Sequence, residues 1–311
     1  MENAGVNCER IILKMSDGYD NCIMAWKGNS SANALVISHG MKEYALRYDE
    51  VASFFAQRGF VVFAYNHRGH GEEAKSRGEL GFLAEKNGFC RVVEDLCEVV
   101  RYAKGCCPSG TLALLGHSFG SFVVQGYIER YGGEIDVCLL SGSAGPRRFL
   151  VGAGKCLAWM LKSVCGKRSR LAFMEWAVFG NYNRHIENPK SKNSWLCSDE
   201  DVVAQYDSDE LCAFVPTVGF FYDMFCGMTM VHKRENMKNI PKDLPVFLFS
   251  GTEDSVGGYG SSLRELYDCY REVGIENVEL KLYEGGRHEM LNEKCKFDVC
   301  EDMLRFIAGR V

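Results

Sequence analysis

The chain has 311 residues, of which 47% are hydrophobic and 25% are charged, a balance typical of an ordinary globular protein. Its 36 basic and 41 acidic residues give a net charge of −5, and the basic run at 167–170 is short, so we expect no nucleic-acid partner. No stretch approaches the roughly eighteen apolar residues that a transmembrane helix requires, so we expect no transmembrane segment.

The first ten residues and the cysteines indicate the compartment. Residues 1–10 have no basic segment followed by an apolar run and a small-residue cleavage site, so nothing marks the chain for secretion. The 15 cysteines are odd in number, are scattered through apolar segments and form no C-x-x-C pair. Such cysteines are typical of small buried hydrophobic residues in a reducing compartment, so we expect a cytoplasmic protein.

Strand-like and helix-like segments alternate along the first half of the chain. Residues 8–15 and 21–28 are β-like runs around the turn Ser16–Tyr19, which predicts a hairpin. Apolar strand-like runs then occur at 34–40, 60–67, 111–120 and 136–144, with amphipathic helical stretches at 48–59, 89–105 and 121–133. This alternation predicts a mostly parallel sheet with helices on both faces.

The alternation stops at Gly145 and resumes after about ninety residues. The segment between is rich in aromatic and methionine residues at helical spacing, which predicts a helical insertion. Strands at 244–254 and 278–286, a helix at 262–274 and a closing helix follow it. We therefore expect an α/β core in two parts, residues 1–144 and 236–311, with a helical cap insertion at 145–235.

The segment Gly116-His117-Ser118-Phe119-Gly120 lies where a strand-like run meets a helical one. Glycines on both sides of a serine allow a tight, strained turn that exposes the hydroxyl group. The string alone is common by chance, but its position between strand and helix makes it specific. We predict that Ser118 is a nucleophile.

A serine hydroxyl needs a base, and the base needs an acid to orient it. In folds with this elbow the chain order is serine, acid, histidine. Asp254 ends the strand-like run 244–254 and is the predicted acid, with Glu253 as the lesser candidate. His288 follows the next strand and is the only histidine after His232, so it is the predicted base.

Acyl transfer also needs donors aimed at the developing oxyanion. The backbone N–H of Phe119 is one candidate, and the N–H of Met41 is the other because Gly40 permits close backbone approach. This chemistry requires no metal and no organic cofactor. We expect His67 and His70 to pack or hydrogen-bond rather than to bind metal.

With these residues placed, nearly the whole chain resembles the monoacylglycerol lipase and lysophospholipase group of α/β hydrolases, which is often grouped with serine aminopeptidases. The resemblance rests on five ordered motifs: HGMKEYALRY (39–48), NHRGHG (66–71), GHSFG (116–120), FSGTEDSVG (249–257) and YEGGRHEMLNE (283–293). It implies the α/β-hydrolase fold, the triad Ser118, Asp254 and His288, and an oxyanion hole formed by Met41 and Phe119.

Three positions depart from the family pattern. The family commonly has glycine where Lys42 stands and histidine where Tyr44 stands, which predicts an altered entrance beside the oxyanion loop. Asn66 replaces the usual aspartate, a change expected to affect loop support rather than chemistry.

The apolar cap favours a small lipid-like ester with an apolar acyl chain, such as a monoacylglycerol or a lysophospholipid. We expect most of the cap's aromatic and methionine residues to pack inside the cap and against the core. A serine aminopeptidase is the alternative enzyme, and its cap acids would be Asp199, Glu200, Asp201, Asp207, Asp209 and Glu210. A noncatalytic hydrolase-like binding protein is the third reading. Transient membrane contact through the cap and the oligomeric state stay open.

Overall fold

The computed structural model describes residues 5–29 and 31–310. At the start of the chain β1 (Asn7–Lys14) and β2 (Asp20–Lys27) pair antiparallel, which confirms the predicted hairpin. The turn is closed by the Gly18 N–H, which donates to the Met15 carbonyl at 2.8 Å.

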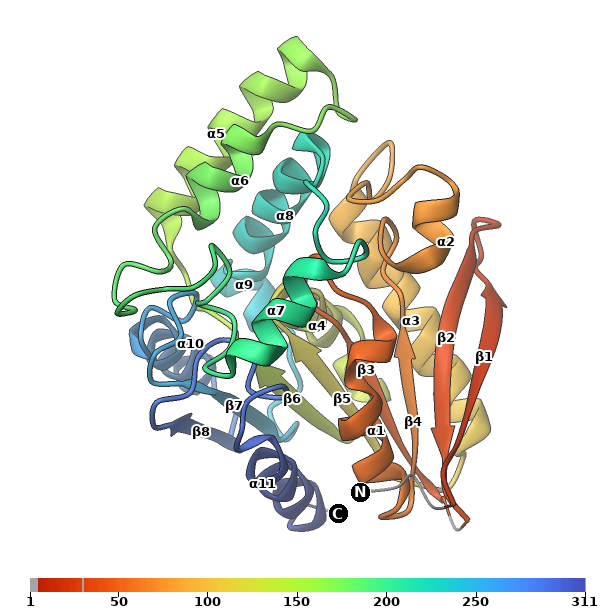
Figure 1. The fold of residues 1–311 in the computed structure, drawn as a ribbon. Coiled ribbons are helices and arrows are strands. Elements are labelled where there is room, and N and C mark those ends of the chain that lie inside the picture. Colours follow the sequence, from red (N-terminus) through yellow and green to blue (C-terminus); the bar gives the residue numbers. More distant parts are fainter. Residues whose placement is uncertain (1–4, 30, 311) are drawn as a thin grey trace.

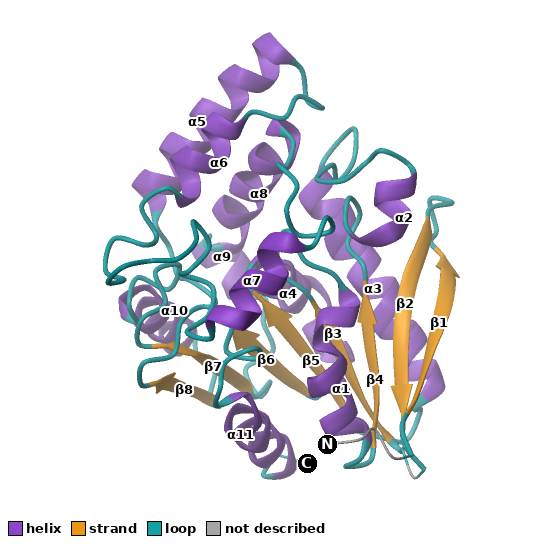
Figure 2. Cartoon of the chain, in the orientation of Figure 1, coloured by secondary structure: helices purple, strands orange, loops and turns teal. Residues whose placement is uncertain are grey.

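Eight strands form one sheet in the order β1-β2-β4-β3-β5-β6-β7-β8. The remaining strands are β3 (Asn33–Ser38), β4 (Phe60–Tyr65), β5 (Leu112–His117), β6 (Val137–Ser141), β7 (Val246–Gly251) and β8 (Val278–Tyr283). Pairing is antiparallel from β1 to β4 and parallel from β4 to β8. The predicted mostly parallel sheet is therefore confirmed (Figure 2).

Helices cover both faces of the sheet, and alternate strand residues point to opposite faces. On β3, Val36 joins the cluster under α3 and α4, whereas Leu35 joins the cluster under α1 and α11. The helices of the core are α1 (Asp49–Ala56), α3 (Gly88–Cys106), α4 (Phe119–Tyr131), α10 (Ser261–Glu272) and α11 (Lys296–Ala308). A buried hydrophobic layer thus covers each face of the sheet. The carboxyl ends of the parallel strands lie along the edge that faces helices α5 to α8 (Figure 1).

Five helices lie between β6 and β7 in the chain (Figure 1). They are α5 (Arg148–Cys165), α6 (Ala172–Phe179), α7 (Glu200–Ser208), α8 (Val218–Val231) and α9 (Arg234–Met237). Helix α8 packs closely against the core, since a Cβ at Gly227 would lie 2.1 Å from the Phe89 ring. Helix α8 also packs closely against α5, because a Cβ at Gly154 of α5 would lie 2.5 Å from the Phe225 ring. We call residues 145–235 the cap segment.

Most aromatic and methionine residues of the cap segment are buried or half-buried, as expected, but a few large side chains are exposed. Phe221 and Met174 are buried, but Trp159, Phe173 and Trp176 are more than half exposed. Helices α5 and α6 stand at the far side of α8 from the core, so one face of this pair has no neighbour within the described chain (Figure 1). Helical spacing indicates that such residues share a face, but it does not indicate what covers that face.

Four short elements were not expected from the sequence. They are α2 (Gly71–Ser76), α9, and the 3-10 helices η1 (Ala45–Tyr48) and η2 (Gly132–Glu134). Each has six residues or fewer, too short for a hydrophobic period to appear in the sequence. None of the described helices has the length and apolarity needed to cross a membrane.

Candidate active site

Ser118 lies at the turn between β5 and α4. Its backbone has φ 51° and ψ −119°, a conformation that costs a residue with a side chain about 1–3 kcal/mol. A Cβ at Gly116 would lie 2.7 Å from the Gly120 carbonyl oxygen, and a Cβ at Gly120 would lie 2.0 Å from the Ser38 carbonyl oxygen. Both glycines are therefore required by the turn, which presents the partly exposed Ser118 at the carboxyl edge of the sheet.

His288 and Asp254 come from the loops after β8 and β7. His288 Nδ1 lies 3.0 Å from Asp254 Oδ1, and both side chains are buried. His288 Nε2 has no hydrogen-bond partner in the described part of the chain. Burial by itself lowers the pKa of His288, but the Asp254 carboxylate offsets this effect and the pKa is raised. Asp254 therefore stabilises the protonated form of the His288 ring.

Asp254 is held by two further donors. Ser250 Oγ donates to Oδ2 at 2.5 Å, and the Val256 N–H donates to Oδ1 at 2.8 Å. Glu253, the lesser candidate, is 54% exposed, and its Oε2 lies 3.6 Å from Arg287 Nε. The structure thus brings Asp254 rather than Glu253 to His288. Ser250 was not predicted as part of the site. Its signal in the sequence was a hydroxyl side chain near the end of β7, four residues before Asp254.

Met41 and Phe119 line the same cavity as Ser118. Phe119 is the first residue of α4, so its N–H belongs to the donors that a helix start leaves unpaired. A Cβ at Gly40 would lie 2.6 Å from Glu43 Oε1 and 3.2 Å from the Ser118 Cβ, so the absence of a side chain lets the loop after β3 lie close to Ser118. The structure thus brings both predicted oxyanion donors to the wall beside Ser118.

A buried charge network supports the loop between β3 and η1, residues 39–44, which carries Met41 and which we call the oxyanion loop. Glu43 accepts the Gly40 N–H, and Arg47 Nη1 lies 2.9 Å from Glu43 Oε2. The same guanidinium binds both carboxylate oxygens of Glu289, at 2.9 and 2.7 Å. Because Glu289 follows His288, the network joins the oxyanion loop to the loop of the predicted base. Glu43 and Arg47 are only four residues apart, but nothing local in the sequence indicates Glu289, which lies 242 residues from Arg47.

Burial acts on both carboxyl groups of this network. It raises the pKa of Glu43 to about 7. Burial also tends to raise the pKa of Glu289, but Arg47 outweighs it and the pKa falls to about 2. Glu289 is therefore the ionised partner of Arg47 near neutral pH.

The three departures from the family pattern all have defined contacts. Lys42 is buried, and its Nζ forms an ion pair with Glu175 of α6. Tyr44 donates its hydroxyl to Asp209 Oδ2 at 2.7 Å, just after α7. Asn66 accepts a backbone N–H from the start of η1 at 2.9 Å, and so supports the loop.

His39, His67 and His70 form a buried cluster, with ring centroids 4.4, 5.1 and 6.1 Å apart. His67 Nε2 lies 3.0 Å from the His39 carbonyl oxygen, and His70 Nδ1 lies 3.0 Å from the Arg68 carbonyl oxygen. Burial lowers the pKa of all three, to about 4 for His70, so they pack as neutral rings. Within residues 5–29 and 31–310, no group of three or more His, Cys, Asp or Glu is arranged to hold a metal ion.

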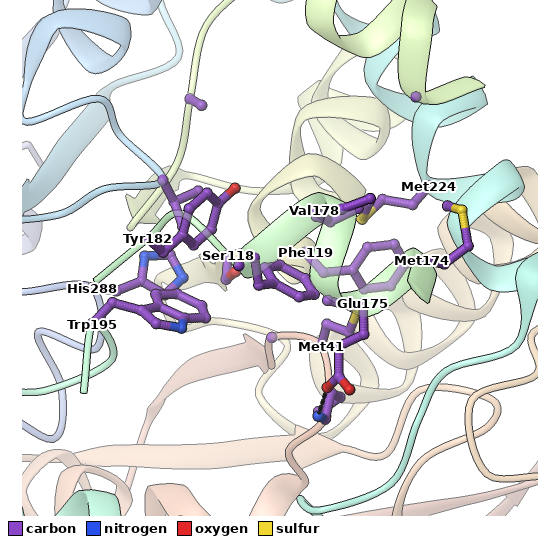
Figure 3. Close-up of a pocket in the computed structure, with 18 of the residues that line it drawn as sticks. Met41, Ser118, Phe119, Met174, Glu175, Val178, Tyr182, Trp195, Met224 and His288 are labelled. Carbon is purple, nitrogen blue, oxygen red and sulfur yellow. Dashed lines mark hydrogen bonds and ion pairs between the residues drawn. The ribbon is translucent and has the colours of Figure 1, made fainter. Parts of the chain in front are cut away.

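A cavity of about 760 Å³ lies between the core and the cap segment, with Ser118 and His288 in its wall (Figure 3). Its volume is within the usual range of small-molecule sites. Its cap walls are largely apolar and come from α5, α6 and α8: Leu150, Val151, Leu157, Met174, Val178, Phe179, Met224, Phe225 and Met228. Trp195 of the cap segment packs against the His288 ring at a centroid distance of 5.2 Å, so the cap segment contacts the predicted base.

Comparison with known proteins gives consistent matches. A family model described as serine aminopeptidase, S33, matches residues 29–295. A monoglyceride lipase of Rattus norvegicus is 35% identical over 90% of this chain and 84% of its own length. A monoacylglycerol lipase of Mycolicibacterium smegmatis is 28% identical over 99% and 96%. The crystal structure of a thermostable carboxyl esterase from Bacillus coagulans, in complex with glycerol, superposes with a TM-score of 0.89 and 25% identity over 98% and 99%.

Proposed function

Because the chain belongs to the serine aminopeptidase S33 family of α/β hydrolases, in its monoacylglycerol lipase and lysophospholipase group, we propose that it is a lipase-like esterase acting through Ser118. The substrate is an ester of an apolar acyl chain with a small polar alcohol, as in a monoacylglycerol. One observation carries this proposal. Ser118 on its strained turn and the His288–Asp254 pair meet at one cavity with apolar walls.

The reaction begins with attack of Ser118 Oγ on the ester carbonyl. His288 Nε2 takes the hydroxyl proton, while Asp254 holds the Nδ1 side of the ring. The N–H groups of Met41 and Phe119 stabilise the tetrahedral oxyanion. Collapse releases the alcohol, which takes the proton from His288, and leaves an acyl group on Ser118. Water activated by the same histidine then hydrolyses this acyl-enzyme.

The cavity wall supports an apolar acyl group. Met174 and Val178 of α6 and Met224 of α8 line it, and Figure 3 shows these side chains near one another and away from His288. Flexible methionine side chains adapt to a flexible hydrocarbon. The acyl chain therefore runs from Ser118 toward the cap helices, and the alcohol lies toward His288.

An aminopeptidase reading finds less support. A free substrate ammonium needs an available carboxylate in the cavity. Within the described residues, none of the six cap acids named for that role lines the cavity: Asp199, Glu200, Asp201, Asp207, Asp209 and Glu210. The carboxylates that do line the cavity are Glu43, Glu175 and Glu289, and each is already paired with Arg47 or Lys42. A neutral ester fits this charge balance better than a cationic amine does.

The reading as a noncatalytic binding protein also finds less support. Such a protein typically lacks one member of the serine, histidine and acid set. Here Ser118, His288 and Asp254 are all present, and the turn at Ser118 keeps a conformation whose strain serves no purpose in simple packing.

We also propose transient contact of the cap with a lipid surface. Seven large apolar side chains of α5 and α6 are exposed, and we call them the apolar cap face: Phe149, Leu150, Trp159, Met160, Val164, Phe173 and Trp176. Leu150 and Trp176 also line the cavity, so this face continues into the site. A lipid surface that covers it would deliver acyl chains directly to the cavity.

Co-sedimentation with phosphatidylcholine vesicles tests this contact. We expect the wild type to sediment with vesicles and the double variant Trp159→Ser/Trp176→Ser to stay largely in the supernatant. Equal sedimentation of the two proteins would contradict the contact. A dimer that dissociates in the double variant would show that a second copy covers the face instead.

We place the reaction in the cytoplasm and treat residues 1–144 and 236–311 as the catalytic core around the cap insertion 145–235. All fifteen cysteines lie in the described residues and are free thiols, and Cys138, Cys197 and Cys300 among them are buried. Free thiols in such number suit a reducing compartment.

A turnover panel tests the proposed function. It compares p-nitrophenyl esters of increasing acyl length, monoacylglycerols, a lysophospholipid and aminoacyl-nitroanilides, with Ser118→Ala as the control. We expect turnover that depends on Ser118 and is highest for medium or long acyl chains. Preference for the nitroanilides would make the enzyme a peptidase, and turnover that survives in Ser118→Ala would contradict the role of this serine.

A further inference from the structure

Lys42 has an unusual place beside the predicted oxyanion donor Met41. Its backbone φ is 60°, in the left-handed region where a side chain is disfavoured by about 1–2 kcal/mol and glycine is not. The side chain does not compensate by reaching water, because it is only 5% exposed. The chain therefore keeps a strained, buried lysine where glycine would be easier.

The burial of Lys42 makes sense only with its partner. A buried ammonium is strongly disfavoured unless it is paired, and burial lowers the pKa of Lys42 despite the opposing effect of Glu175. Glu175 lies in the first turn of α6 and is itself only 14% exposed. Its second cation, Lys192, is 3.8 Å away and 72% exposed, so Lys42 is the buried partner of this carboxylate.

The next two residues of the loop contact opposite sides of the cavity, one the cap segment and the other the core. Tyr44 also reaches the cap segment, where its hydroxyl donates to Asp209 at 2.7 Å. Glu43, between them, faces the core and binds the Gly40 N–H and Arg47. The oxyanion loop is thus held from the core by one side chain and from the cap by two.

We propose that Lys42 and Glu175 are positioning residues, whose ion pair ties the oxyanion loop to cap helix α6 and so aims the Met41 N–H at the reacting carbonyl. This inference rests on the proposed esterase function. Figure 3 shows Glu175 and Met41 next to each other at the lower wall of the cavity.

The consequence is a link between cap closure and catalysis. An oxyanion donor acts only when it lies about 2.7–3.1 Å from the developing charge. A shift of about 1 Å can slow the reaction about 100-fold. When α6 moves away, the Lys42–Glu175 pair must break, and the loop keeps its core contacts and the Tyr44–Asp209 hydrogen bond but loses the support next to Met41. The oxyanion hole is therefore complete only under a closed cap.

Steady-state kinetics of single variants and of a charge-swapped double variant test the proposal. The variants are Lys42→Met, Glu175→Gln and the exchanged pair Lys42→Glu/Glu175→Lys. The measurements are kcat and KM for a p-nitrophenyl ester, and the affinity for an alkylboronic acid, whose tetrahedral adduct with serine mimics the intermediate. We expect each single variant to lower kcat and boronic-acid affinity about 10- to 100-fold with KM little changed. The exchanged pair should recover most of that loss.

Lys190→Met, at an exposed lysine of the same cap segment, is the matched control and should keep wild-type kinetics. Thermal unfolding of every variant identifies any that lose activity by unfolding. Single variants with kcat within about 2-fold of the wild type, or an exchanged pair as slow as the singles while folded, would overturn the proposal. If the wild type itself has no Ser118-dependent turnover, the proposed function fails and this inference fails with it.

Discussion

Ser250 Oγ donates a 2.5 Å hydrogen bond to Asp254 Oδ2, from the strand that leads into the loop of this acid. Asp254 is fully buried and depends on such donors to stay ionised, since burial tends to raise its pKa and His288 and its hydrogen bonds lower it. In the proposed mechanism, Ser250 therefore acts through Asp254.

We expect Ser250→Ala to lower kcat about 10-fold with KM unchanged, because a hydrogen bond to a buried charge contributes about 1.5–3 kcal/mol. Steady-state kinetics measures this. Ser261→Ala, which removes an exposed hydroxyl bonded to the Gly258 carbonyl, is the control and should have wild-type kinetics. A change confined to KM would argue against a role through the acid.

The choice of acid is tested by two isosteric changes. Asp254→Asn should lower kcat about 10⁴-fold, as in other serine–histidine–aspartate triads, because the amide favours the wrong histidine tautomer. Glu253→Gln should have little effect, since its side chain is half exposed and lies near Arg287. The opposite ranking would identify Glu253 as the acid.

The activity should rise with pH through the pKa of His288. Only the neutral ring accepts a proton, so activity is lost below that pKa. Burial lowers the pKa, but Asp254 raises it above the ordinary value of 6.5, and the midpoint of kcat/KM should lie above that value. In Asp254→Asn the residual activity should have a lower midpoint. A wild-type midpoint below 6.5 would be inconsistent with the ion pair.

Fold stability should decrease in mild acid because of the buried histidine cluster. Burial lowers the pKa of His70 from 6.5 to about 4, so the folded state binds fewer protons than the unfolded chain between these values. The contribution of His70 to the free energy of unfolding is therefore complete above pH 6.5, and it is lost as the pH falls toward 4. It corresponds to about 3 kcal/mol for His70.

Urea unfolding at several pH values measures this dependence. His70→Gln should weaken the loss of stability in acid, whereas His185→Gln, at an exposed histidine, should retain all of it. If both variants lose stability in acid as steeply as the wild type, His70 does not contribute.

The strained turn gives a prediction about folding. Gly120→Ala would place a Cβ 2.0 Å from the Ser38 carbonyl oxygen, which the backbone cannot accommodate in place. We expect a loss of more than about 3 kcal/mol in the free energy of unfolding. Gly152→Ala in α5 has nothing within 4 Å of the new Cβ and should be neutral or stabilising by up to about 1 kcal/mol. Similar unfolding curves for the two variants would contradict the description of the turn.

Much of the fold could be predicted because its signals are local. Each buried strand is a short apolar run, and the glycines around Ser118 mark one turn between one strand and one helix. Asp254 and His288 could be proposed because they follow strands whose carboxyl ends share one edge of the sheet. These inferences need only the order of the elements.

The remaining contacts depend on how segments far apart in the chain pack together. Arg47 and Glu289 meet across 242 residues, and Lys42 meets Glu175 across 133. No local pattern indicates such pairs, since they depend on the orientation of α6 and of the loop after β8. For the same reason, the sequence did not indicate that Trp176 is exposed.

The most direct test of the central claim is mass spectrometry of the protein quenched during turnover of a p-nitrophenyl ester. We expect the mass of one acyl group on the peptide that contains Ser118, and neither the adduct nor turnover in Ser118→Ala. Acylation of another residue, or undiminished turnover in Ser118→Ala, would contradict the assignment of Ser118 as the nucleophile.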